Sequence, residues 1–204
     1  MSLKTHKILA IDTTTDGCSA ALQFESTLLI RYESKPREHA RLLLPMINSL
    51  LEEAGLTLND LDVLACTRGP GSFTGVRIGT SVIQGLSAGL DKPVVLVSTL
   101  RAVAQAAYRL AGVSQVFATL DARMQEVYWG LFSLDANGIM QAQSAEQLGE
   151  PNQIRLPPGA WIARQDAPDA QDVARIAQFE YALGHFVAAL DVQPVYLRNN
   201  IVRA

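Results

Sequence analysis

A strand that ends in an aspartate and turns back into a second strand occurs twice in this chain, and this repeat most constrains the fold. In the first copy, apolar residues 8–12 end at Asp12, and residues 18–24 follow after a polar turn. In the second copy, residues 116–121 end at Asp121, and residues 127–134 follow. Short apolar runs separated by polar turns are typical of hairpin strands, and a repeated unit indicates related lobes. We therefore expect two lobes that each open with a hairpin.

Between and after the hairpins, strand-like and helical patterns alternate. Apolar residues recur with helical spacing in residues 38–54, 76–90, 99–111 and 179–190, whereas residues 27–32, 61–67 and 93–97 are short apolar runs. A sheet that begins with a hairpin and continues by strand and helix alternation is a mixed α/β sheet. We expect lobes over residues 1–112 and 113–204, with a surface excursion at the proline- and glycine-rich residues 150–172. Pro45 is expected to kink or restart its helix.

Composition and charge exclude several classes of protein. The 204 residues are 49% apolar, enough to bury a sizeable core. The net charge of −3 comes from 17 basic and 20 acidic residues without a basic run, so the chain alone is a poor candidate for binding nucleic acid. No apolar segment is long enough to cross a bilayer or to form a signal peptide. We expect a soluble, cytoplasmic protein without membrane contact, in which Cys18 and Cys66 are buried thiols.

Two segments carry residues that could contact a nucleotide or another anion. Asp12 and Thr13, followed by two more threonines, could lie beside a phosphate or a hydrated Mg²⁺; a turn in which they bond to nearby backbone is the alternative. In RGPGSFTGVR, residues 68–77, the glycines permit close backbone approach and Ser72 can cap the next helix, which makes a generic anion site. The segment has no lysine, so it is not a Walker A loop.

The helix that follows contains more glycine than helix stability explains. Gly75 and Gly79 lie one turn apart, and Gly85 and Gly89 repeat this spacing on an adjacent face. A glycine inside a helix costs about 1 kcal/mol relative to alanine. Several in one helix therefore indicate close approach of another backbone, which is either the chain's own sheet or a partner helix.

Searches for a metal centre and for a nucleophile find little. His6, His39 and His185 are isolated, and none has a second ligand at the spacing of a metal pair. Neither cysteine has a histidine nearby in sequence. We expect no metal site and no catalytic residue. A charged cluster in the second hairpin is either a site or an ion-paired turn: Asp121, Arg123 and Glu126.

Six segments, in order across nearly the whole chain, resemble the bacterial TsaB (YeaZ) family. They are ILAIDT at residues 8–13, REH at 37–39 with LP at 44–45, RGPGSFTGVR at 68–77, VSTL at 97–100, DARM and EVY within 121–128, and PVYLRN at 194–199. The resemblance implies an actin/Hsp70/sugar-kinase type of α/β fold, with two ribonuclease-H-like lobes, mixed sheets and a shortened C-terminal lobe. It also implies a role in making threonylcarbamoyladenosine beside the anticodon of tRNAs that read codons starting with A.

In that family the chemistry belongs to a paralogue, TsaD, whose metal-binding HxxxH motif would fall on Thr99 and Val103 of this chain. Neither residue can hold a catalytic metal. The resemblance therefore implies a non-catalytic scaffold that binds TsaD as a heterodimer, meets TsaE through that complex and contacts tRNA only within it. ATP and a metal are expected on the partner subunits, with no cofactor on this chain, and the chain alone is expected to form a homodimer.

Two other functions compete with the scaffold. An autonomous ATP-binding phosphotransferase of the same fold is favoured by Asp12 and the glycine segment, but no second nucleotide motif can be placed. A metallopeptidase is disfavoured because the metal ligands are missing.

The partner surface is predicted on the helices over residues 38–54 and 73–90. The apolar stripe of the first is wider than one buried face requires, and the second has glycines that a helix facing water does not need. Exposed apolar area usually marks an interaction site. The predicted interface residues are His39, Leu42, Leu43, Met46, Leu50, Phe73, Gly75, Arg77, Gly79 and Val82. A second copy would use the same helices, so homodimer and heterodimer are expected to compete.

Overall fold

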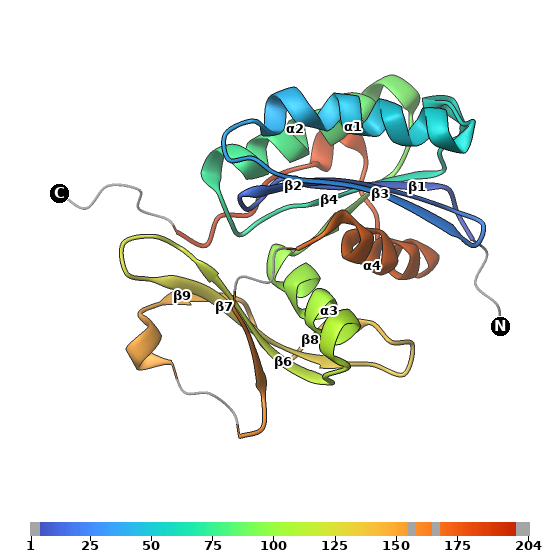
Figure 1. Ribbon diagram of the computed structural model, residues 1–204. Helices are drawn as coiled ribbons and strands as arrows, with labels where there is room; N and C mark the ends of the chain where they lie inside the picture. Colours follow the sequence, from blue (N-terminus) through green and yellow to red (C-terminus); the bar gives the residue numbers. More distant parts are fainter. Residues whose placement is uncertain (1–4, 155–157, 165–167, 199–204) are drawn as a thin grey trace.

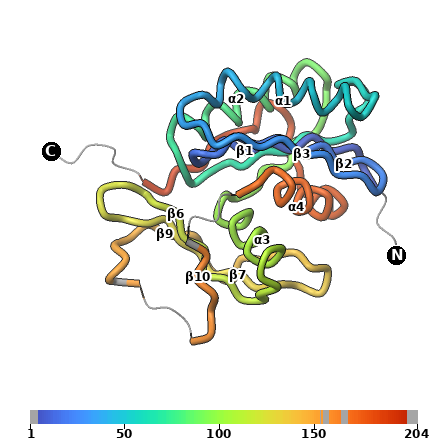
Figure 2. Tube along the Cα trace, in the orientation of Figure 1, coloured from blue at the N-terminus to red at the C-terminus, as the bar shows by residue number. Residues whose placement is uncertain are grey.

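The chain folds into four layers, in which two sheets alternate with two pairs of helices (Figure 1). The computed structural model describes residues 5–154, 158–164 and 168–198. Within these residues, two five-stranded sheets have the orders β3-β2-β1-β4-β5 and β10-β6-β7-β8, and β9 also pairs with β7. Helices α1 and α2 cover the outer face of the first sheet, and α3 and α4 lie between the two sheets (Figure 2).

The first sheet begins with the N-terminal hairpin. β1 (Ile8–Asp12), β2 (Gly17–Phe24) and β3 (Thr27–Ser34) form an antiparallel meander. β4 (Val63–Thr67) and β5 (Val94–Val97) continue the sheet in parallel on the other side of β1. α1 (His39–Ala54), the short 3-10 helix η1 (Leu58–Asp60) and α2 (Phe73–Leu90) connect these strands. β1 and β4 are buried throughout because helices cover both faces of the sheet.

The second sheet repeats this arrangement in a smaller form. β6 (Gln115–Asp121) pairs antiparallel with β7 (Val127–Leu134), as β1 does with β2. β10 (Trp161–Arg164) lies parallel to β6, as β4 does to β1. β8 (Met140–Ala142) and β9 (Gln147–Gly149) pair with β7, and η2 (Pro151–Gln153) precedes β10. The two predicted hairpins and the mixed α/β fold with two sheets are confirmed.

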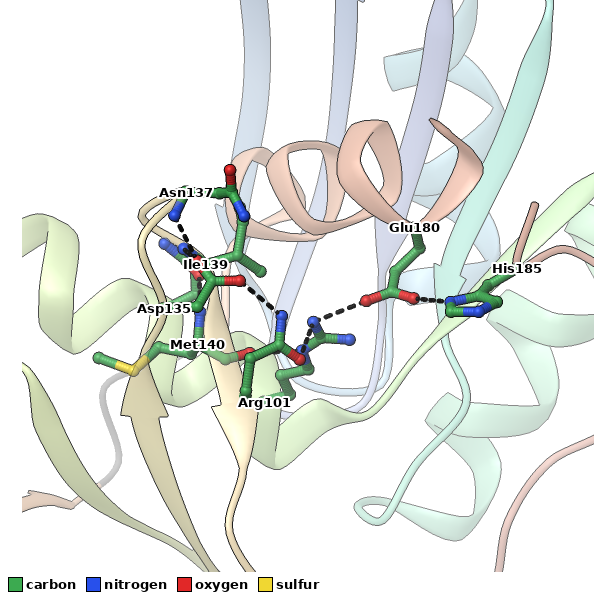
Figure 3. A network of polar contacts seen from close by, with 9 residues as sticks. Arg101, Asp135, Asn137, Ile139, Met140, Glu180 and His185 are labelled. Atoms are coloured by element: carbon green, nitrogen blue, oxygen red, sulfur yellow. Dashed lines mark hydrogen bonds and ion pairs between the residues drawn. The ribbon is translucent and has the colours of Figure 1, made fainter. Parts of the chain in front are cut away.

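Helix α3 (Thr99–Ala111) precedes the expected boundary at residue 112 but packs on the second sheet, and helix α4 (Ala170–Ala182) follows it but packs on the first. This arrangement corrects the expected division into residues 1–112 and 113–204. α3 packs on β6 and β7 of the second sheet, whereas α4 packs on β1 and β4 of the first. One helix pair fills the space between two sheets, so neither lobe is a continuous segment. Polar contacts join this layer: Arg101 of α3 pairs with Glu180 of α4 at 2.7 Å and donates to the Met140 carbonyl of β8 at 2.6 Å (Figure 3).

One prediction for the C-terminal part is wrong, and another is confirmed only in part. The helix expected over residues 179–190 is the end of α4, which stops early because Gly184 has a left-handed φ of 81° and the His185 amide donates to the Glu180 carbonyl. Beyond it, Val187 pairs with Val94 at the edge of the first sheet, and η3 (Ala189–Asp191) follows. Of residues 150–172, expected as a surface excursion, residues 150–152 and 158–159 are exposed, but the segment also contains β10 and the start of α4, and residues 155–157 and 165–167 lie outside the described residues.

Three smaller predictions can also be compared with the structure. α1 runs through Pro45 without a restart, because Pro45 lies on the exposed side, where water can bond to the carbonyl that loses its donor. Cys18 and Cys66 are buried free thiols, as predicted, and burial raises their pKa values to about 11 and about 12. In the part of the chain that the structure describes, no helix has the length and hydropathy to cross a membrane.

Candidate functional site

A cavity of about 760 Å³ opens between the two hairpin turns. The β1–β2 turn and the N-terminal end of α2 line it from one sheet, and the β6–β7 turn lines it from the other. Its polar lining includes Thr14, Ser72, Asp121, Arg123 and Arg198, and its aromatic lining is Tyr32, Phe73, Tyr128 and Tyr196. The cavity lies beyond the carboxyl ends of β1 and β6, where α/β sheets commonly bind ligands.

Asp12 ends β1 but is buried and is absent from the cavity lining. Its Oδ1 accepts hydrogen bonds from the Thr14 amide at 3.3 Å, from the Thr14 hydroxyl at 2.7 Å and from the Thr67 hydroxyl. No hydrogen-bond donor among the described residues reaches Oδ2. Burial raises the pKa of Asp12 to about 6, although the hydrogen bonds from Thr67 and Thr14 oppose the shift. These contacts match the alternative interpretation, a turn that bonds to its own neighbours.

Thr13 and two of the α2 glycines pack against each other inside the subunit. The Thr13 hydroxyl donates to the Gly75 carbonyl at 2.7 Å. A Cβ added to Gly75 would lie 2.0 Å from the Thr13 carbonyl oxygen, and one added to Gly79 would lie 2.6 Å from Thr13 Oγ1. These glycines therefore permit approach of the chain's own β1–β2 turn, which corrects their placement on the partner surface. Gly85 and Gly89 are exposed, with nothing within 4 Å of an added Cβ.

Ser72 is the one predicted anion-contact residue in the cavity lining. It caps α2, since its hydroxyl accepts a hydrogen bond from the Gly75 amide at 3.3 Å, and its own amide donates to the Thr14 carbonyl at 2.7 Å. A Cβ on the preceding Gly71 would lie 2.5 Å from that carbonyl oxygen. The glycine segment thus holds the N-terminus of α2 against the β1–β2 turn. Asp12 and Thr13 do not share the cavity with Ser72, so the phosphotransferase alternative loses two of its three contacts.

Four of the interface residues predicted on α1 are buried within the subunit. Leu43, Met46 and Leu50 belong to the core between α1 and the first sheet. His39 is also buried, and its Nε2–H donates to the carbonyls of Thr15 at 2.9 Å and Gly17 at 3.2 Å. The wide apolar stripe is mainly this core, so these side chains are not available to a partner.

The exposed part of the predicted interface lies at the start of α2. Phe73 is 44% exposed and Arg77 is exposed, whereas Leu42 and Val82 are half-buried. On α1 the sequence interpretation missed Leu44, which is 50% exposed beside the exposed Pro45. Helical spacing from Ala40 through Leu44 to Asn48, an exposed face, was the signal that could have found it.

The charged cluster of the second hairpin is an ion-paired turn. The Asp121 carboxylate pairs with Arg123 at 3.2 Å and accepts a hydrogen bond from the Arg123 amide at 2.7 Å. Glu126 pairs with Arg198 at 2.6 Å, and both side chains are largely buried. The role of Arg198 was not predicted, because no local pattern connects it with Ala122, which lies 76 residues earlier in the chain.

Comparison with known proteins identifies the family. Residues 32–182 match the family model of TsaD, tRNA N6-adenosine threonylcarbamoyltransferase. The "tRNA threonylcarbamoyladenosine biosynthesis protein TsaB" of Escherichia coli is 40% identical over 96% of this chain and 96% of its own length. The chain belongs to the TsaB family. The Haemophilus influenzae TsaB is 37% identical over 95% of this chain and 94% of its own, and the structure "YeaZ from Pseudomonas aeruginosa" has a TM-score of 0.90 with 41% identity, covering 94% of this chain and 100% of that chain.

Membership of the TsaB family makes the start of α3 informative. Thr99 and Val103, on which the resemblance places the HxxxH motif of TsaD, are both fully buried. Val103 packs in the core between α3 and the second sheet. Among residues 5–154, 158–164 and 168–198, no three His, Cys, Asp or Glu side chains are grouped as a metal site.

Proposed function

We propose that this chain is a non-catalytic subunit that activates TsaD, and acts with TsaE, in transfer of threonylcarbamoyl to the adenosine beside the tRNA anticodon. The observation that carries the proposal is 40% identity, over nearly the full length, to a protein named for this biosynthesis. A buried threonine and a buried valine at the TsaD ligand positions support the non-catalytic role. ATP and the metal then belong to the partner subunits, and tRNA is contacted only within the complex.

The surface for TsaD is the outward side of α1 and α2. On α2 the exposed residues follow one another at helical spacing: Phe73, Arg77, Ser81, Gly85 and Ala88. On α1 the exposed apolar residues include Leu44 and Pro45. Small residues on α2 allow a partner helix to approach closely, and the apolar residues at one end supply area that is buried on binding. A second copy of this chain fits the same surface, so homodimer and heterodimer compete for it.

An omission assay tests the activator role. Purified TsaD, TsaE and this chain are incubated with ATP, threonylcarbamoyl-adenylate and unmodified tRNA, and each protein is left out in turn. We expect modification to be lost when this chain is omitted and to be absent when it is the only protein present. Full modification without this chain contradicts the activator role, and modification by this chain alone contradicts the non-catalytic role.

The variant Gly85→Gln tests the surface. Because Gly85 lies in open space, the change should raise helix stability by up to about 1 kcal/mol, yet its side chain blocks close approach and should weaken TsaD binding at least about tenfold. Arg175→Gln, an exposed position of α4 on the opposite face of the first sheet, is the matched control and should leave binding unchanged. If Gly85→Gln binds TsaD as the wild type does, the exposed residues of α2 around Gly85 are not part of the TsaD-binding surface.

A further inference from the structure

Residues 194–198, which we call the C-terminal strap, cross from the first sheet to the second. The Val195 amide donates to the Arg68 carbonyl, at the loop after β4, at 2.8 Å. The Tyr196 hydroxyl accepts a hydrogen bond from Arg77 Nε of α2 at 2.9 Å. Arg198 donates to the Ala122 carbonyl of the β6–β7 turn at 3.1 Å and pairs with Glu126 at 2.6 Å. Within five residues, the strap therefore contacts the start of α2 and the β6–β7 turn.

The two ends of the strap differ in exposure. At the α2 end, the Arg77 guanidinium lies 3.7 Å from the centroid of the Phe73 ring, and the Phe73 and Tyr196 rings are 5.6 Å apart. Phe73 is 44% exposed and Tyr196 is 42% exposed. At the other end, the side chains of Arg198 and Glu126 are only 16% and 15% exposed. A partner on α2 can therefore touch one end directly, whereas the other end is a largely buried ion pair.

The β6–β7 turn has a disfavoured backbone conformation, although the Ala122 amide donates to the Glu126 carbonyl within it. Arg123, Met124 and Gln125 have φ values of 62°, 56° and 63°, a run of left-handed residues without glycine. Such conformations are disfavoured for residues with a Cβ and persist where surrounding contacts hold them. Arg198 supplies such contacts, and the turn and the strap line the same cavity.

Other contacts that link the two sheets run through α3 and α4 and do not include the strap. Arg101 joins β8 to Glu180 of α4, and Glu180 also pairs with His185 at 2.7 Å (Figure 3). None of these residues lines the cavity. The β6–β7 turn forms one wall of the cavity, and Arg198 of the strap is the residue that contacts this wall.

We propose that the C-terminal strap couples the binding of a partner on α2 to the position of the β6–β7 turn over the cavity. The partner packs on Phe73, Arg77 and Tyr196 and so fixes the position of the strap. Because Arg198 of the strap contacts the turn, the turn is then fixed as well. Aromatic residues and arginine are the types that dominate binding energy in interfaces. Among the described residues no carboxylate pairs with Arg77, so the matching partner surface presents a carboxylate beside an apolar patch. The identity of that partner as TsaD rests on the proposed function.

Hydrogen exchange of the free chain tests the coupling without a partner. Arg198→Met should make the amides of residues 121–127 exchange at least about fivefold faster, and Arg77→Met should also speed their exchange, although Arg77 does not touch the turn. In the double variant these amides should exchange only slightly faster than in Arg198→Met, because both substitutions act through the same strap. Arg41→Met, an exposed arginine of α1 paired with Glu38, is the control and should leave the turn unchanged. If Arg77→Met leaves exchange of the turn at the wild-type rate, the coupling is refuted.

A second arm adds TsaD. Binding should slow exchange in residues 121–127 of the wild-type chain, whereas the Arg198→Met chain should bind TsaD with similar affinity and show no such slowing. If the wild-type chain does not bind TsaD, the proposed function is contradicted. The coupling is then judged by hydrogen exchange of the free chain. Binding without any change in the turn overturns the coupling itself. Exchange in β1 and β4 reports whether each variant is folded, and Arg198→Lys replaces Arg198→Met if it is not.

Discussion

Replacing Asp12 by asparagine is expected to stabilise the protein, and to do so more above neutral pH than below it. Burial raises the pKa of Asp12 from 3.8 to about 6 in the folded protein. At about 1.4 kcal/mol per unit, this shift means that the ionised carboxylate costs the folded state about 3 kcal/mol. The side chain is fully buried, so solvent screening does not reduce the effect.

The sign follows from proton binding. Between the unfolded pKa of 3.8 and the folded pKa of about 6, the folded protein holds a proton that the unfolded chain has released. The contribution of Asp12 to stability is therefore present at acidic pH and is lost as the pH rises through about 6. The asparagine variant keeps an acceptor for Thr14 and Thr67 but does not titrate. Near pH 8 the free energy of unfolding of the variant should exceed that of the wild type by about 1–3 kcal/mol. Near pH 5 this difference should be smaller by about 1–1.5 kcal/mol.

Urea unfolding of the wild type and the variant at both pH values measures this difference. Thr67→Val provides a second test, because it removes a hydrogen bond that lowers the pKa of Asp12; it should destabilise the protein more near pH 8 than near pH 5. Asp16→Asn changes an exposed carboxylate of the same turn and is the matched control. A difference between wild type and Asp12→Asn that does not vary with pH would refute the raised pKa.

Other predictions concern packing and buried groups. Gly79→Ala should lower the free energy of unfolding by about 1–3 kcal/mol because its Cβ meets the β1–β2 turn, whereas Gly85→Ala should raise it by about 0.5–1 kcal/mol; the reverse order in urea unfolding contradicts both. Arg109→Met should cost about 3 kcal/mol near pH 7, since it leaves the buried carboxylate of Asp172 unpaired, and an effect below about 1 kcal/mol contradicts this. The Cys66 thiol, whose pKa burial raises to about 12, should react with a thiol reagent only after unfolding, and rapid labelling of the native protein contradicts that expectation.

The hairpins and most element types could be predicted because their signals are local. The strands that end at Asp12 and Asp121 are apolar runs bounded by polar turns, and their partners follow within a few residues. The helix caps are equally local, as Ser72 and Ser98 show by accepting hydrogen bonds from amides three residues later. Such features depend on neighbours that the sequence itself places together.

The exchange of α3 and α4 between the sheets could not be predicted in the same way. Both helices are short and alanine-rich, and nothing in their own periodicity says which sheet each will cover. Their placement depends on contacts between residues far apart in sequence, such as the pair of Arg109 and Asp172. The strap contact between Arg198 and Glu126 is of the same kind.

The glycines of α2 show that spacing alone does not indicate what a glycine pair contacts. Gly75 with Gly79, and Gly85 with Gly89, have the same spacing and the same cost in helix stability, about 1 kcal/mol per glycine. The first pair is required by the chain's own β1–β2 turn, which leaves no room for a Cβ. The second pair has open space around it, so nothing within the subunit offsets its cost. A glycine pair that the subunit's own packing does not require is the better marker of a partner surface, and this is why we propose that surface along Gly85 rather than Gly79.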